Sequence, residues 1–238
     1  MAAQLPIQKQ LRALASPEVA RIAQGFFKTG KGQYGEGDVF LGIKVPVLRA
    51  LAKQQRDAGR DVVQTLLDSA YHEERVFALL LLMQFYAQSG EAERQDAYDL
   101  YLANTQRINN WDLVDISAPH IVGRHLEYRP RKLLHKMAKS ASLWERRIAI
   151  IATFHFIRRD DFGDTLRIAE TLLHDEHDLM HKAVGWMLRE VGKRDQARLE
   201  GFLRSHYTEL PRTALRYAIE RFSPDLRLRY LRGDLPAA

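Results

Sequence analysis

Trp111 and Asp115 are the residues of this chain best suited to chemistry, and they stand four apart within residues 109–123, NNWDLVDISAPHIVG. At this spacing a helix places the indole ring and the carboxylate on one face. Apolar residues flank the carboxylate, and burying an acid there is costly without a cationic partner. That partner could be a protein side chain in a structural ion pair, or a cationic substrate. We interpret the neighbouring Asp112 as a first-turn acid that favours the positive end of the helix dipole, with no catalytic role.

Helical periodicity dominates the elements that must position this pair, and strand-like alternation is missing from the sequence. The expected helices are residues 17–28, 46–58, 61–70, 72–88, 91–104, 111–118, 130–140, 143–157, 161–173, 179–193, 196–206, 212–222 and 225–231. The start signals are Ser16-Pro17, Val45-Pro46, Arg129-Pro130, and Ser142 with Glu145 three residues later as a capping box. The sequence therefore predicts an all-α fold.

A weak repeat runs through the second helix of successive helix pairs. Ala78, Ala149, Ala183 and Ala218 each stand among large apolar residues after an Arg or Lys, at intervals of 71, 34 and 35 residues. One period after Ala78 falls on residues 113–115. The expected helix 111–118 therefore takes the same place in its own helix pair. Pairs repeating at this interval stack into a solenoid with a shared core and a concave inner wall. We expect Trp111, Asp115, Arg147 and Trp186 on that wall.

Composition describes an ordinary globular chain of 238 residues, 46% hydrophobic and 28% charged. We expect one elongated domain over residues 1–238, with capping helices in residues 1–60, repeats in about 61–222 and a short tail in 223–238. Cysteine is absent from the sequence, which excludes disulfides, thiolate nucleophiles and cysteine-ligated metals. The N-terminus lacks a basic-then-apolar leader and the longest apolar run, residues 76–83, is too short for a membrane span. We therefore expect a cytoplasmic protein.

The net charge is +6, and it is unevenly distributed. Residues 1–119 hold 13 Lys+Arg against 14 Asp+Glu, whereas residues 120–238 hold 23 against 16. A basic half suits a polyanionic partner, nucleic acid first, although a basic helical protein can also simply have a solvated surface.

Three segments, together with an N-terminal motif, resemble the AlkD-type DNA alkylation repair glycosylases over roughly residues 17–222. The segments are 110–115 (NWDLVD), 144–150 (WERRIAI) and 182–190 (KAVGWMLRE), and the motif is Phe40-Leu41-Gly42-Ile43 followed by Pro46 and Arg49. The resemblance implies a right-handed α-solenoid of HEAT-like antiparallel helix pairs with a concave basic groove.

The resemblance also implies roles for four residues. Trp111 and Trp186 resemble the two tryptophans that face the damaged nucleotide, Asp115 the catalytic carboxylate, and Arg147 the arginine beside the phosphate backbone. Gly185 before Trp186 would allow close backbone approach, and core packing beside Met187 and Leu188 is the alternative interpretation of Trp186. Members of this family leave the lesion stacked in the duplex, unlike glycosylases that flip the base into a pocket.

One departure from the family concerns an early helix. A family tyrosine that faces the lesion is replaced here by Phe26-Phe27, so that a hydroxyl is lost or Tyr34 substitutes for it. The glycine-rich connection 28–39 is longer than in the best-described member, and we interpret it either as a plain surface loop or as a contact to the DNA backbone. It follows a helix and lacks the Gly-Lys-Ser/Thr ending of a P-loop.

Several basic residues are further candidates for contacts to DNA phosphates. Arg146 and Arg147 are about 100° apart on a helix, so at most one faces the site, and we select Arg147. Lys44, Arg49, Lys182 and Arg189 are the other candidates, each with a plain surface charge as the alternative. His174, His177 and His181 lie among acids, but they lack the HExxH order and we expect no metal.

These residues suit hydrolysis of the N-glycosidic bond of N3- or N7-alkylated purines, such as 3-methyladenine and 7-methylguanine, in duplex DNA. Such bases are cationic and leave as neutral molecules, so neither a general acid nor a cofactor is needed. A monomeric, monofunctional DNA glycosylase of base excision repair is the expectation. The alternatives are a non-catalytic HEAT-like module for damaged or branched nucleic acid, and a protein-binding helical repeat. Only an enzyme needs a carboxylate facing a polyanion.

Overall fold

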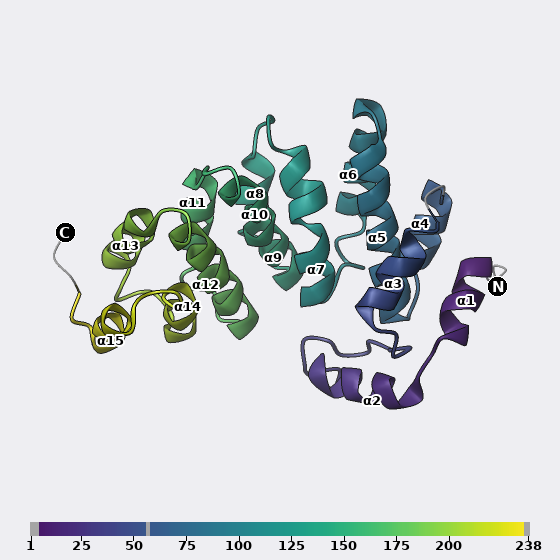
Figure 1. The fold of residues 1–238 in the computed structure, drawn as a ribbon, viewed down its shortest axis with the longest axis horizontal. Coiled ribbons are helices and arrows are strands. Elements are labelled where there is room, and N and C mark those ends of the chain that lie inside the picture. The colour runs from purple at the N-terminus through teal and green to yellow at the C-terminus, as the bar shows by residue number, and fades with distance from the viewer. Residues whose placement is uncertain (1–4, 56–57, 236–238) are drawn as a thin grey trace. The chain divides into compact units, whose positions relative to one another are not determined.

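The computed structural model describes residues 5–55 and 58–235, and the regular elements in these ranges are helices. They are α1 (Pro6–Ala13), α2 (Pro17–Phe26), α3 (Val45–Ala52), α4 (Arg60–Leu67), α5 (His72–Gln88), α6 (Glu91–Ala103), α7 (Trp111–Ser117), the π-helical η1 (Pro119–Gly123), α8 (Lys132–Met137), α9 (Leu143–Ala152), α10 (Phe154–Ile157), α11 (Gly163–Thr171), α12 (Asp178–Gly192), α13 (Gln196–Ser205), α14 (Arg212–Ala218) and α15 (Pro224–Arg232) (Figure 1). Extended pairing in the described ranges is limited to an isolated bridge between Val39 and Tyr71. The predicted all-α fold is confirmed.

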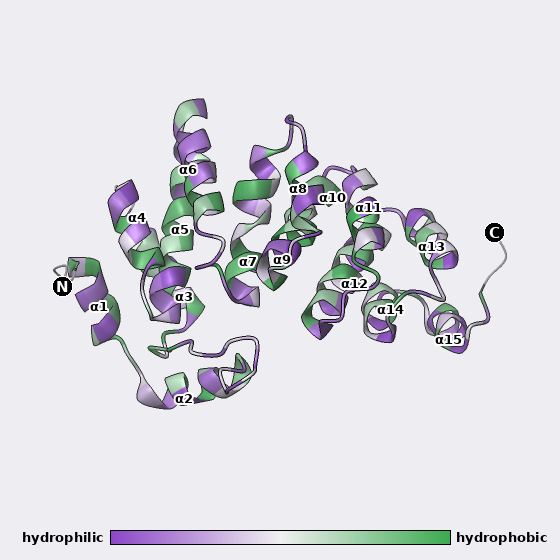
Figure 2. Cartoon of the chain, turned by 180° about the vertical axis from the view of Figure 1, so that it is seen from behind, coloured by the Kyte–Doolittle hydropathy of each residue, from purple (hydrophilic) through white to green (hydrophobic). Residues whose placement is uncertain are grey.

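The chain divides into two compact units, Met1–Ser117 and Ala118–Ala238, which we describe separately. In the first unit, α5 packs against α3, α4, α6 and α7. In the second unit, α9 packs against α8, α11 and α12, and α12 also packs against α13 and α14. Outer helices such as α4 and α6 carry both hydrophobic and hydrophilic residues, as helices that bury one face should (Figure 2). Among the described residues, no helix combines the length and apolar character needed to span a membrane.

The alanines of the predicted repeat all lie in buried helix positions. Ala78 is in α5, Ala149 in α9, Ala183 in α12 and Ala218 in α14, and each is at most 1% exposed. A small side chain in the buried stripe lets the next helix approach closely. The repeat therefore marks the helices that form the core of each unit.

Gly185 lies where α12 and α14 pack closely against each other. A Cβ atom at this position would lie 2.5 Å from the Ala214 carbonyl oxygen and 2.6 Å from the Tyr217 Cβ atom. Such distances are far below van der Waals contact, so the backbones of α12 and α14 meet at a point where only glycine fits. Close backbone approach at Gly185 is confirmed.

Helix boundaries agree with several predictions and correct others. Residues 72–88 form α5 as predicted, and Ser16 and Ser142 cap α2 and α9 by accepting hydrogen bonds from the amides of Val19 and Glu145. The Glu145 carboxylate accepts a hydrogen bond from Ser140, 2.6 Å away. The predicted helix 143–157 is interrupted at Thr153, whose hydroxyl donates to the Ile150 carbonyl at 2.6 Å.

Two other boundaries differ from expectation. The helix expected from Pro130 begins at Lys132, because the Arg131 side chain folds back onto the carbonyls of Leu126 and Glu127. Helix α1 precedes the first expected helix and is held by Glu74, which accepts from Arg12 at 2.7 Å. A lone short helix has little intrinsic stability, so α1 depends on tertiary contacts such as this ion pair and the burial of Ile7 and Leu11.

The Phe40-Leu41-Gly42-Ile43 motif wraps around the buried carboxylate of Glu73. The backbone amides of Leu41, Gly42 and Ile43 donate to Glu73 at 2.8, 2.7 and 3.2 Å. Gly42 has a φ of +81°, a conformation that residues with a Cβ atom rarely adopt. The motif therefore attaches the segment before α3 to the first turn of α5.

Candidate active site

The N-terminus of α7 carries the Trp111–Asp115 pair. Its start is fixed by the fully buried Asn110, whose side-chain oxygen accepts from the Trp111 amide at 2.8 Å and whose amide donates to Asp38 at 3.4 Å. Trp111 and Asp115 are each partly exposed and occupy positions i and i+4 of the helix. The Asp115 carboxylate is thus not sealed inside the core, where it would be inaccessible to a substrate.

A buried hydroxyl lies near the Asp115 carboxylate. Tyr101 is fully buried and hydrogen-bonded to the Ser117 hydroxyl at 3.0 Å. Burial raises the pKa of Tyr101, and the nearby negative charge of Asp115 raises that pKa further. Tyr101 therefore stays protonated at physiological pH and can act only as a neutral hydroxyl.

Aromatic rings surround Trp111 on the side of α2. Phe27 stacks on the indole with a centroid distance of 5.2 Å and an interplanar angle of 20°, and Phe26 meets it edge-on at 5.8 Å. Phe26 is 62% exposed. The Tyr34 hydroxyl donates to the Phe26 carbonyl at 3.5 Å. The Phe26-Phe27 departure and Tyr34 therefore lie in the immediate surroundings of Trp111.

A buried histidine, His72, connects these rings to the start of α7. Its ring is 4.5 Å from Phe40 and 5.0 Å from Phe27, measured between centroids. Its Nδ1 atom is 2.7 Å from Asp38 and its Nε2 atom is 2.8 Å from Asp112. Because ionised carboxylates only accept hydrogen bonds, both ring nitrogens must carry protons. The pairing makes His72 an imidazolium.

The charge of His72 is stabilised by its partners. Burial alone would lower its pKa, but the hydrogen bonds to Asp112 and Asp38 outweigh burial and raise the pKa of His72 to about 9. Burial likewise opposes ionisation of Asp38, yet His72 and then Arg75, 2.5 Å away, lower the pKa of that acid. Asp112 stands in the first turn of α7 and forms an ion pair with His72. This pair holds the start of the helix, which is a structural role.

Trp186 lies on α12 in the second unit and is partly exposed. Its indole N–H donates to the Glu190 carboxylate at 3.1 Å, and its ring lies 5.9 Å from Phe154. The indole is therefore held at its edge by a charge one helical turn away.

Arg146 and Arg147 on α9 point to different partners. Arg146 pairs with Asp175 at 2.6 Å. Arg147 is buried and donates to the Leu179 carbonyl at 2.7 Å. The expected divergence of the two side chains is confirmed, and the role of Arg147 toward DNA stays a prediction.

The other predicted phosphate contacts differ in whether an acidic side chain pairs with them. Lys182 pairs with Asp178 at 2.6 Å, and Arg189 pairs with Glu190 and Glu220. Lys44 and Arg49 are exposed, and neither has an ion-pair partner among the residues described. The role of these two cations toward DNA stays a prediction.

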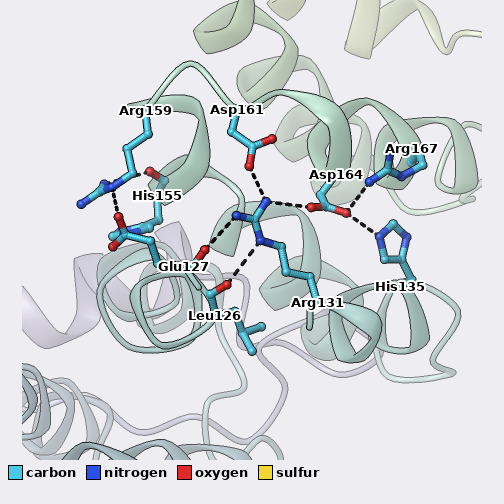
Figure 3. Close-up of polar contacts among 9 residues, drawn as sticks. All are labelled: Leu126, Glu127, Arg131, His135, His155, Arg159, Asp161, Asp164 and Arg167. Atoms are coloured by element: carbon cyan, nitrogen blue, oxygen red, sulfur yellow. Dashed lines mark hydrogen bonds and ion pairs between the residues drawn. The ribbon is translucent and has the colours of Figure 1, made fainter. Parts of the chain in front are cut away.

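A further polar cluster stabilises the second unit around Arg131. Figure 3 shows the Arg131 guanidinium between the carboxylates of Asp161 and Asp164, at 2.6 and 2.9 Å. Burial opposes the charge of Asp164, but hydrogen bonds from His135 and Arg131 lower its pKa. The Arg131 guanidinium also lies 3.7 Å from the centre of the Phe156 ring. We interpret this cluster as structural, because its acids are neutralised by its own cations.

The three histidines considered for a metal have separate partners. His174 pairs with Glu209 at 3.2 Å, His177 accepts from the Leu179 amide at 3.1 Å, and His181 bonds to the Asp175 carbonyl at 2.5 Å. In the part of the chain that the structure describes, no group of three or more His, Asp or Glu residues could hold a metal ion.

His72 and Glu190 are site residues that sequence reasoning missed. The signal for His72 was a run of four charged or titratable residues, 72–75, at the start of an otherwise apolar helix. Such residues need partners when they are buried, so the run indicates a buried polar cluster. The signal for Glu190 was its position four residues after Trp186. The partners of His72, by contrast, lie 34 and 40 residues away.

Comparison with known proteins assigns the chain to a class. The sequence profile described as "DNA alkylation repair enzyme" matches residues 7–222. A solved structure described as "Predicted DNA alkylation repair enzyme from Enterococcus faecalis" is 18% identical, with a TM-score of 0.68, and the match covers 88% of this chain and 97% of that one. None of the curated proteins compared with this chain matches it.

This protein belongs to the DNA alkylation repair enzyme family, because the family match spans most of its length. The resemblance identified from the sequence is confirmed, and the similar structure confirms the helical fold. The family implies an enzyme that acts on DNA in alkylation repair.

Proposed function

We propose that this protein is a monofunctional DNA glycosylase that hydrolyses the N-glycosidic bond of N3- or N7-alkylated purines in duplex DNA. The observation that carries the proposal is the partly exposed Trp111–Asp115 pair on one face of α7, in a chain of this family. A module that only bound DNA would gain nothing from a carboxylate facing a polyanion.

Asp115 is the proposed catalytic residue. As the bond to an alkylated purine breaks, positive charge moves from the base to the sugar, which becomes an oxocarbenium-like ion. A carboxylate 4 Å from such a charge contributes about 4 kcal/mol at an effective dielectric near 20. The same carboxylate can orient the water that attacks the sugar, so one acid serves both purposes.

Trp111 is proposed to select the cationic base. An indole face attracts a cation by about 0.5–2 kcal/mol, depending on desolvation. Phe27 already covers part of the indole, and Phe26 presents an exposed ring beside it. These rings exclude water, which strengthens the interaction between Asp115 and the developing charge.

Trp186 and Arg147 are the proposed functional residues of the second unit. Trp186 offers another indole face to the cationic base, and Arg147 helps to place the phosphate backbone. Lys44 and Arg49 in the first unit, and Lys182 and Arg189 in the second, are proposed phosphate contacts. We propose that the lesion stays stacked in the duplex and that the enzyme works as a monomer without a cofactor.

Release of 7-methylguanine and 3-methyladenine from methylated duplex DNA tests this function. We expect release by the wild type and at least about a tenfold loss of rate in Asp115→Asn, which corresponds to 1.4 kcal/mol of barrier. DNA affinity should change little. Asp99→Asn is the matched control, because it removes an exposed carboxylate from α6. Wild-type protein that releases no alkylated base, or an Asp115→Asn variant as fast as the wild type, would refute the proposal.

A further inference from the structure

Glu190 is a nearly buried carboxylate at the edge of the Trp186 indole. It is 9% exposed, and its Oε1 atom accepts the indole N–H at 3.1 Å. The same carboxylate contacts the Lys193 ammonium at 2.8 and 2.9 Å and the Arg189 guanidinium at 3.2 Å. Arg189 also donates to Glu220, whereas the hydrogen bond of the Trp186 indole N–H goes to Glu190. Two cations and two carboxylates therefore form one network with no net charge, and Glu190 connects this network to the Trp186 indole.

This arrangement changes the electrostatics of the indole in two ways. An N–H group that donates to a carboxylate is polarised, so electron density increases on the ring and its face becomes more attractive to a cation. Glu190 and Glu220 together also neutralise Lys193 and Arg189, which would otherwise repel a positively charged base near the ring. Both effects favour a cationic over a neutral ligand on the same indole face.

We infer that Glu190 is a specificity-determining residue, which tunes Trp186 to prefer alkylated, cationic purines over neutral bases of the same shape. The inference rests on the proposed function and adds to it the residue that sets charge discrimination. Glu190 acts through the indole and does not touch the substrate, so it is a positioning residue. A carboxylate that served only to hold the end of α12 would affect stability without affecting discrimination by charge.

The experiment compares Glu190→Gln with Glu220→Gln. Each substitution removes one negative charge from the same group of side chains, but only Glu190 bonds to the indole. Binding is measured to duplexes that carry 7-methylguanine, 2′-fluorinated to prevent hydrolysis, or its neutral isostere 7-methyl-7-deazaguanine. Discrimination is the ratio of the two Kd values. We expect this ratio to fall about fivefold in Glu190→Gln and to stay within about twofold of the wild type in Glu220→Gln.

A double-mutant cycle and an NMR signal separate tuning from structural damage. With Trp186→Phe as background, Glu190→Gln should alter the ratio no more than Glu220→Gln does, because the polarised N–H group is gone and only the loss of one charge remains. The indole N–H resonance of Trp186, identified by its loss in Trp186→Phe, should shift in Glu190→Gln and stay in place in Glu220→Gln. These readouts do not depend on turnover.

Equal ratios in the two Gln variants, or an effect of Glu190→Gln that still exceeds that of Glu220→Gln without Trp186, would overturn the inference. In that case wild-type release of methylated purines would still uphold the glycosylase. Wild-type protein that neither releases these bases nor prefers the cationic duplex would remove the proposed function and the inference together.

Discussion

The buried imidazolium of His72 predicts that stability falls as pH rises through the alkaline range. The ring is 2% exposed, and both of its nitrogens face carboxylates, at 2.7 and 2.8 Å. In the unfolded chain these contacts are lost and histidine titrates at its ordinary value of 6.5, whereas the pKa of His72 in the folded state is about 9. Between these values the folded protein holds a proton that the unfolded chain has released.

The sign and size of the effect follow from this difference. Because the folded-state pKa is raised, the contribution of His72 is fully present below pH 6.5 and is lost as pH rises to about 9. Each pKa unit corresponds to about 1.4 kcal/mol, so the loss amounts to about 3 kcal/mol. His155 and His177 do not interfere, because their lowered pKa values place their effects below pH 6.5.

Urea unfolding at intervals between pH 6 and 9.5 tests this prediction in the wild type and in His72→Gln. The free energy of unfolding of the wild type should fall by about 3 kcal/mol more than that of the variant. His174→Gln is the matched control, since this histidine is mostly exposed, and its pH profile should follow the wild type. Parallel profiles for wild type and His72→Gln, or a His72 ring that NMR shows to be neutral at pH 7.5, would refute the reasoning.

Two further substitutions test the packing that supports the site, and both are measured by urea unfolding. Gly185→Ala should lower the free energy of unfolding by about 3 kcal/mol, because the added Cβ atom meets the backbone of α14. Gly201→Ala is the control, because its Cβ atom meets open space and the substitution should be neutral or slightly stabilising. Equal stabilities of the two variants would contradict the close approach at Gly185. Glu73→Gln should cost about 3 kcal/mol, because an amide cannot accept from all three amides of the Leu41–Ile43 segment, while the exposed Glu170→Gln should have little effect. A Glu73→Gln variant as stable as the wild type would show that these bonds contribute little.

Much of the helical fold was predictable because its signals are local. Helical periodicity placed α5 at residues 72–88, and serine caps placed the starts of α2 and α9. The spacing of Trp111 and Asp115 put them on one helical face without knowledge of any other element. One boundary was mispredicted at Arg131, whose side chain folds back onto the carbonyls of Leu126 and Glu127 while it also pairs with Asp161 and Asp164 from a distant segment.

The surroundings of the candidate site were not predictable in the same way. Nothing near residue 111 in the chain indicates that Phe27 stacks on the indole, because the two rings come from segments separated by more than eighty residues. The position of Glu190 was visible as an i, i+4 neighbour of Trp186, but its burial depends on how α12 packs against its neighbouring helices.

The amino-acid order alone determined the helices, their caps, the repeated small residues and the family, because each depends on neighbours within one or two turns or on residue identity. Tertiary structure alone decided which charges are buried and paired, as with His72 between Asp38 and Asp112. The physical reason is that burial and partner choice depend on side chains brought together from distant segments, and periodicity carries no information about which segments meet.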